Sequence, residues 1–188
     1  MSAVASYDFE RFAILVVEDN GFMRHLMTSV LKNLGFGRVD AASHGGEAID
    51  FLRAIGKSPS RGGLMSIDMI VSNWQMEPID GLELLRWVRR AKDSPDRCVP
   101  FVMVTAFADM PRLRQARDAG VTEFMVKPYS IATLCNRVLA VIERPRQFVS
   151  SPKFFGPDRR RRARSRGHRA PGSEGQGRRR RLRPELTR

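Results

Sequence analysis

Cysteines and long apolar runs are scarce in this 188-residue chain, and their scarcity excludes several classes of protein. Two cysteines, Cys98 and Cys135, are too few for a disulfide framework, and neither has neighbours at metal-ligand spacing. The longest uninterrupted apolar run, residues 12–17, is far too short to cross a membrane, and no basic segment followed by an apolar core opens the chain. We therefore expect a cytoplasmic protein with reduced thiols and no membrane span.

Acidic residues are scarce at the carboxyl end. The formal net charge is +13 at pH 7. Residues 1–143 carry 17 basic and 17 acidic side chains, whereas residues 144–188 carry 16 basic and 3 acidic ones. The whole excess of positive charge therefore lies in the last 45 residues, attached to a balanced stretch of the size of one ordinary domain.

Short apolar segments alternate with amphipathic ones between residues 12 and 143. Five short apolar runs are typical of strands buried on both faces: residues 12–17, 38–41, 69–72, 101–105 and 123–126. Apolar residues recur at helical spacing in the segments that follow them: about 23–34, 45–55, 80–88, 111–119 and 130–142. This alternation predicts an α/β fold, a doubly wound five-stranded parallel sheet with helices on both faces.

The composition changes near Pro145. We predict an N-terminal lead-in at residues 1–11, one domain at residues 12–144 and a tail at residues 145–188. In the tail, apolar residues become sparse and Pro, Gly, Ser and Arg dominate. Because such a composition cannot bury enough apolar surface to offset the entropy of ordering, we expect the tail to be disordered.

Polar residues end several of the predicted strands. Glu18 and Asp19 follow the first strand, Asn73 the third, Thr105 the fourth and Lys127 the fifth. Since the carboxyl ends of parallel strands meet at one edge of such a sheet, we expect these side chains to form one pocket. Adjacent carboxylates can hold a hard cation such as Mg²⁺, while a hydroxyl and an ammonium group can grip the oxygens of a phosphoryl group.

The pocket residues lie in segments that resemble a known family. These segments are Glu18-Asp19, IVSNWQM at residues 70–76 with Asp80-Gly81, VMVTA at residues 102–106, and FMVKP at residues 124–128. In this order they resemble the receiver (CheY-like) domain of bacterial two-component response regulators. The resemblance implies a flavodoxin-like receiver fold and a noncatalytic signalling role.

The resemblance also implies roles for the matching residues. Two carboxylates, Glu18 and Asp19, and the backbone carbonyl of Gln75 would bind a metal ion. The phosphoryl-pocket and switch positions would be the hydroxyl of Thr105, the aromatic ring of Phe124 and the ammonium group of Lys127. The proline that follows this lysine would be cis.

One position departs from the family pattern: Asn73 stands where the phosphate-accepting aspartate belongs. An amide has no anionic oxygen that could attack a phosphoryl group, so we expect no aspartyl phosphorylation. The missing carboxylate also removes one of three negative charges, and we expect Mg²⁺ to bind weakly if it binds. Asn73 can instead donate hydrogen bonds to Asp19, and Lys127 can pair with the acidic residues, which would neutralise the pocket without metal.

The tail contains two arginine runs. They consist of Arg159, Arg160, Arg161 and Arg162, and of Arg178, Arg179, Arg180 and Arg181. Planar guanidinium groups suit bidentate binding to phosphates and to guanine edges, so we expect the tail to bind an anionic ligand. Phe154 and Phe155 precede the first run; they can stack on nucleobases, or they can fold back onto the domain and anchor the tail.

Three functional hypotheses remain open. In the first, the protein is a signalling adaptor that contacts the flagellar motor or a histidine kinase, and its tail binds cyclic di-GMP. This architecture resembles CheY-like proteins with arginine-rich extensions. In the second, the tail is a nonspecific arm for nucleic acid or another polyanion, and its affinity falls steeply with salt. In the third, which Asn73 disfavours, the chain is a conventional phosphorelay receiver. The resemblance places the interaction surface on the fourth helix, fifth strand and fifth helix.

Overall fold

The computed structural model describes residues 9–57, 66–106, 109–152 and 154–159. The chain divides into two units, one spanning Phe9–Asp158 and the other combining Met1–Asp8 with Arg159–Arg188. Apart from Arg159, every described residue belongs to the first unit. The rest of the predicted tail, including both arginine runs beyond Arg159, lies outside the described residues.

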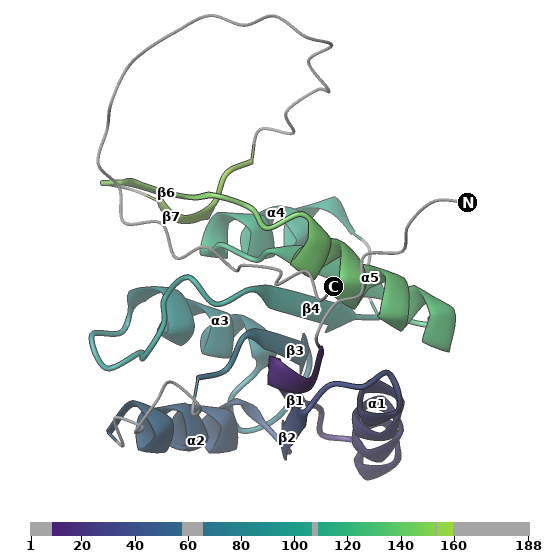
Figure 1. Cartoon of the computed structure of the whole chain (residues 1–188). Helices are drawn as coiled ribbons and strands as arrows, with labels where there is room; N and C mark the ends of the chain where they lie inside the picture. Colours follow the sequence, from purple (N-terminus) through teal and green to yellow (C-terminus); the bar gives the residue numbers. More distant parts are fainter. Residues whose placement is uncertain (1–8, 58–65, 107–108, 153, 160–188) are drawn as a thin grey trace, which may run out of the picture. The chain divides into compact units, whose positions relative to one another are not determined.

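Strands and helices alternate along the first unit (Figure 1). The strands of its main sheet are β1 (Ala13–Val17), β2 (Arg38–Ala42), β3 (Met69–Asn73), β4 (Phe101–Thr105) and β5 (Glu123–Val126). Its helices are α1 (Gly21–Asn33), α2 (Gly45–Lys57), α3 (Gly81–Arg90), α4 (Met110–Ala119) and α5 (Ile131–Glu143). A 3-10 turn, η1 (Phe9–Arg11), precedes the sheet, and two short strands, β6 (Phe148–Ser151) and β7 (Phe154–Pro157), follow α5.

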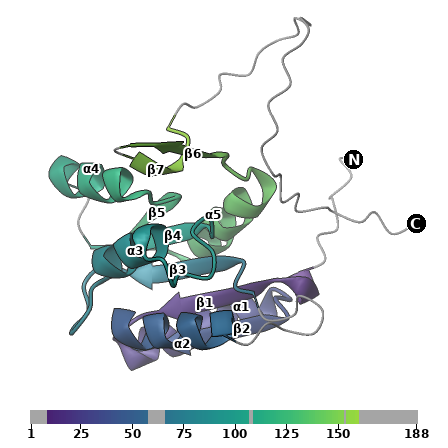
Figure 2. The same ribbon diagram turned by 90° about the vertical axis from the view of Figure 1, so that its left-hand side faces the viewer.

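The main sheet is parallel throughout, with strand order β2-β1-β3-β4-β5. Alternate residues of β1 face opposite cores: Ile14 and Val16 pack with α1 and α5, whereas Leu15 and Val17 pack with α2, α3 and α4. Figure 2 shows these helix layers on the two sides of the sheet. The prediction of a doubly wound five-stranded parallel sheet, the flavodoxin-like receiver fold, is therefore confirmed.

Side-chain caps set where the helices begin. The side chain of Asn20 accepts a hydrogen bond from the Met23 backbone N–H at 3.0 Å, so α1 begins at Gly21, two residues before the predicted start. At α3, Asp80 and Glu83 form a reciprocal capping box. This cap fixes the end of the loop that follows β3, the strand that ends at Asn73.

The compact unit Phe9–Asp158 extends beyond the predicted domain at both ends. The ring of Phe9 lies 4.9 Å from the ring of Phe36, centroid to centroid, so the unit begins at Phe9 rather than at residue 12. At the other end, β6 and β7 form an antiparallel hairpin within the segment that was expected to be disordered. Composition did not predict the hairpin because its burial comes from contacts with α3 and α4 as well as from its own few apolar residues. None of the helices in the described ranges is long and apolar enough to span a membrane.

Candidate phosphoryl pocket

The parallel register brings the predicted pocket residues to one edge of the sheet. Thr105, the last residue of β4, pairs with Val126 of β5. Asn73 ends the neighbouring strand β3, while Glu18 and Lys127 directly follow β1 and β5. Residues far apart in the sequence thereby meet where the strands stop, as expected for a doubly wound sheet.

Asn73 is held by three oxygen atoms. Its Nδ2 lies 2.8 Å from the backbone oxygen of Gln75, 2.9 Å from Asp19 Oδ1 and 3.3 Å from Glu18 Oε1. The side chain is 7% exposed, so water competes little for these contacts. The amide group therefore acts as a hydrogen-bond donor toward the three groups that were expected to bind metal.

Lys127 pairs with the buried acidic residue of the pocket. Its ammonium nitrogen lies 2.9 Å from Glu18 Oε2, the carboxylate oxygen that Asn73 does not contact. Glu18 is 1% exposed, whereas the lysine side chain keeps 26% of its surface in solvent. Both oxygens of the buried Glu18 carboxylate thus have donors that come from this chain.

The two acidic residues respond differently to this environment. Burial raises the pKa of Glu18, although the hydrogen bond from Lys127 opposes the shift. Partial burial also acts to raise the pKa of Asp19, but hydrogen bonding with Glu18 and Asn73 outweighs it and lowers that pKa. Asp19 therefore carries the more firmly ionised carboxylate of the pair.

The remaining predicted positions lie around this centre. Thr105 is fully buried, and its backbone oxygen accepts a hydrogen bond from the Lys127 N–H at 2.7 Å. Phe124 is half-buried against the core beneath α2, α3 and α4. The peptide bond between Lys127 and Pro128 is cis, as the resemblance implied. A second cis bond, Glu77–Pro78, was not anticipated.

Gly81 lets the loop after β3 return close to the strand end. Its N–H donates to the backbone oxygen of Trp74 at 2.8 Å. A Cβ atom at Gly81 would lie only 2.1 Å from the backbone oxygen of Asn73, so any larger residue would displace the strand end. Gly81 is thus required by a close backbone approach next to the pocket.

Sequence reasoning missed two residues beside the pocket. Arg24 of α1 donates from Nη1 to the backbone oxygens of Glu18, at 2.6 Å, and of Asp19, at 3.2 Å. The available sequence signal for Arg24 was its position about one helical turn after the acidic pair. The hydroxyl of Tyr129 is buried and has no hydrogen-bond partner among the described residues, and burial together with the charge of Glu18 raises its pKa to about 12.

The donor set does not fit Mg²⁺. This ion keeps several water ligands in near-octahedral geometry and is usually held by one or two carboxylates whose oxygens are free to face it. Here the amide N–H groups of Asn73 are directed at the candidate oxygens, and Lys127 already neutralises Glu18. Within the described residues, no group of three or more His, Cys, Asp or Glu side chains could hold a metal ion.

Comparison with known proteins covers the same part of the chain. Residues 14–139 match the family described as response regulator receiver domain. Chemotaxis protein CheY-3 of Vibrio cholerae serotype O1 is 31% identical over 131 residues, which cover 70% of this chain and 92% of that protein. Chemotaxis protein CheY of Pseudomonas aeruginosa is also 31% identical over 131 residues, covering 70% of this chain and 96% of that protein.

A solved structure agrees with these matches. A putative response regulator from Chloroflexus aurantiacus superimposes with a TM-score of 0.58 at 25% identity, and the alignment covers 71% of this chain and 98% of that one. The family match ends at residue 139, before the hairpin of β6 and β7. The hairpin is therefore an addition to the matched domain.

Proposed function

Because the chain belongs to the response regulator receiver family, we propose that it is a degenerate receiver, a noncatalytic signalling protein whose conformation is not controlled by aspartyl phosphorylation. One observation carries this proposal. Asn73 occupies the acceptor position, and its amide donates to Glu18, Asp19 and the Gln75 carbonyl. A phosphoryl group arriving there would meet no anionic oxygen able to attack it.

Intact-mass spectrometry after incubation with acetyl phosphate and Mg²⁺ tests the proposal. We expect the mass of the wild-type protein to stay unchanged. The matched control is Asn73→Asp, which restores the carboxylate and should gain the mass of one phosphate. A one-phosphate gain in the wild type that Asn73→Ala abolishes would refute the proposal.

We further propose that the protein signals by binding another protein through α4, β5 and α5. Three exposed apolar side chains on these elements support this surface: Met110 is 58% exposed, Val126 41% and Ile131 54%. Two relatives are named chemotaxis proteins, so a flagellar motor component and a histidine kinase are the first partners to test. Ile131→Asp should abolish binding to the true partner in biolayer interferometry, whereas Phe22→Asp, at an even more exposed apolar residue of α1, should not.

We propose that the signal enters through the arginine-rich tail, which binds an anionic ligand such as cyclic di-GMP. Residues 144–188 carry the entire net charge of +13, and the composition of the tail supports guanine and phosphate recognition. Isothermal titration should show saturable binding of cyclic di-GMP to the full chain and none to a truncation after Asp158, which keeps the hairpin. Binding that instead prefers a nonspecific DNA duplex and collapses with added salt would establish the alternative, a polyanion-binding arm.

A further inference from the structure

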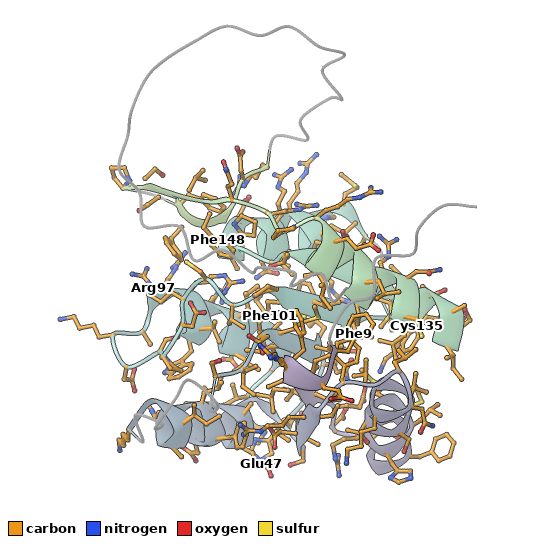
Figure 3. The ribbon with its side chains drawn as sticks, in the orientation of Figure 1. Phe9, Glu47, Arg97, Phe101, Cys135 and Phe148 are labelled. Carbon is orange, nitrogen blue, oxygen red and sulfur yellow. The ribbon has the colours of Figure 1, made fainter. Side chains whose placement is uncertain are left out.

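The hairpin of β6 and β7 packs against a corner of the receiver that lies away from the pocket. It contacts α3 and α4, and Figure 3 labels Phe148 on the hairpin and Arg97 in the segment between α3 and β4. The backbones approach closely: a Cβ atom at Gly156 of β7 would lie 2.8 Å from the Cα of Gly120, the residue that ends α4. Gly156 and Pro157 are buried.

Arg89 is buried at this corner, and among the described residues the negative charge of Asp96 offsets its burial only in part. It is 1% exposed, its Nε donates to the Gly120 oxygen at 3.0 Å, and its Nη1 donates to the Arg97 oxygen at 2.9 Å. Its Nη2 is buried and has no hydrogen-bond partner in the part of the chain that the structure describes. Among the described residues, no carboxylate forms an ion pair with Arg89. A buried cation normally requires such a partner.

Arg97 is locked to Arg89 by a reciprocal contact. Its Nε donates to the Arg89 backbone oxygen at 2.5 Å, so each arginine binds the main chain of the other. The guanidinium group of Arg97 lies 4.4 Å from the ring centroid of Phe155, and that of Arg89 lies 4.9 Å from the ring centroid of Phe148. Two cations thus face two aromatic rings of the hairpin. An aromatic ring stabilises a guanidinium charge less than an anion does.

We propose that Arg89 and Arg97 form a binding site for a phosphate-bearing anion, and that the β6–β7 hairpin closes this site as its internal occupant. The reciprocal backbone contacts hold both guanidinium groups in place, and Arg89 Nη2 is a buried donor that no described residue satisfies. Phosphate oxygens suit paired guanidinium groups better than aromatic faces do. The site is distinct from the Asn73 pocket and from the arginine runs of the tail, and it does not depend on either for its function.

The hairpin is a suitable closing element because it can leave without unfolding the receiver. A two-stranded hairpin is only marginally stable by itself, so its stability here comes from docking. Elements with few buried contacts open at a lower free-energy cost than the core. Because only open molecules can bind the anion, the apparent affinity equals the affinity of the open state multiplied by the fraction of molecules that are open.

Titration of the full chain with inorganic pyrophosphate tests the proposal. Two changes open the hairpin by different means: the double substitution Phe148→Ala and Phe155→Ala removes both rings, and Gly156→Val adds a side chain where it would collide with Gly120. Both lie outside the matched receiver residues, and circular dichroism verifies that each variant is folded. We expect each to bind pyrophosphate at least tenfold more tightly than the wild type in isothermal titration calorimetry.

Additional substitutions test whether the tighter binding of pyrophosphate occurs at the Arg89–Arg97 site. Because every variant keeps the arginine-rich tail, binding by the tail is common to all and cancels in the comparison. Arg97→Ala, combined with each opening change, should remove the tenfold gain. Arg86→Ala, at an exposed arginine of α3, should leave the gain intact. An affinity that does not rise in a folded opening variant, or a rise that survives Arg97→Ala, overturns the proposal.

Discussion

Both carboxylates of the pocket accept hydrogen bonds from this chain's own donors. Substituting Asp for Asn73 should turn this pocket into one that needs a cation. The change replaces three hydrogen bonds with a carboxylate that lies near Asp19 Oδ1, now 2.9 Å from Asn73 Nδ2, and near Glu18 Oε1, now 3.3 Å away. Two unit charges about 4 Å apart repel each other by about 4 kcal/mol at an effective dielectric constant of 20. Lys127 offsets the charge of Glu18, and Asp19 is exposed, so solvent screens part of the repulsion.

We therefore expect Asn73→Asp to lower the free energy of unfolding by roughly 3 kcal/mol without Mg²⁺, counting repulsion and the lost hydrogen bonds to charged acceptors. For a domain of this size, that corresponds to a fall in Tm of roughly 6–12 °C. Mg²⁺ at a hundredfold excess over its Kd should restore about 2.7 kcal/mol to the variant. The wild type should gain nothing.

Differential scanning calorimetry with and without Mg²⁺ measures both effects. Asn73→Ala is the control, because it removes the donor without adding a charge and should show no Mg²⁺ dependence. The reasoning is refuted if Mg²⁺ stabilises the wild type as much as the Asp variant. It is equally refuted if the Asp variant is as stable as the wild type when Mg²⁺ is absent.

Further predictions concern the pocket and the loop beside it. Burial raises the pKa of Glu18 above its ordinary value of 4.5, so the folded state holds this proton more tightly than the unfolded state does. The stabilisation that results is complete below about pH 4.5 and is lost as pH rises through the pKa of the folded state. Urea unfolding should therefore show the wild type losing stability relative to Glu18→Gln as pH rises above about 4.5, and a pH-independent difference would contradict this. Gly81→Ala should lower the unfolding free energy by about 3 kcal/mol, because its Cβ would lie 2.1 Å from the backbone oxygen of Asn73. The matched control Gly21→Ala, whose Cβ would have no neighbour closer than 3.8 Å, should raise it by about 0.5 kcal/mol; equal effects of the two changes would disprove the steric account.

Strands bounded by strong turn signals could be predicted from the sequence. The boundaries of β4 and β5 agree with the predicted runs 101–105 and 123–126, because Pro100 and Gly120 interrupt the apolar pattern before them. The pocket could be predicted for a related reason. Once the strands are parallel, their carboxyl ends must meet, so the identities of the residues after each strand define the site.

The hairpin could not be predicted because its stability comes from tertiary contacts. Phe154 and Phe155 were equally compatible with exposure to a ligand and with folding back onto the domain. The ring of Phe155 stacks on Arg97, which establishes the second alternative for that residue. Neither the buried Arg89 nor its contact with Phe148 has a local sequence signal, since an arginine near the end of a helix usually lies in solvent.

Cap residues explain the smaller differences. Asn20 was available as a start signal for α1, but the apolar periodicity begins only at Met23, so the helix was predicted to start late. Arg24 was missed for the same reason. Once the helix begins at Gly21, this arginine lies within reach of the backbone of the acidic pair.

Nuclear magnetic resonance of the wild-type receiver tests the phosphorylation-independent state most directly. Backbone amide spectra recorded before and after addition of acetyl phosphate and Mg²⁺ report any change at Thr105, Phe124 and Lys127. The hydrogen-bond network around Asn73 predicts that these signals do not move in the wild type, while they shift in Asn73→Asp. Saturable shifts at the same three residues in the wild type would contradict the account.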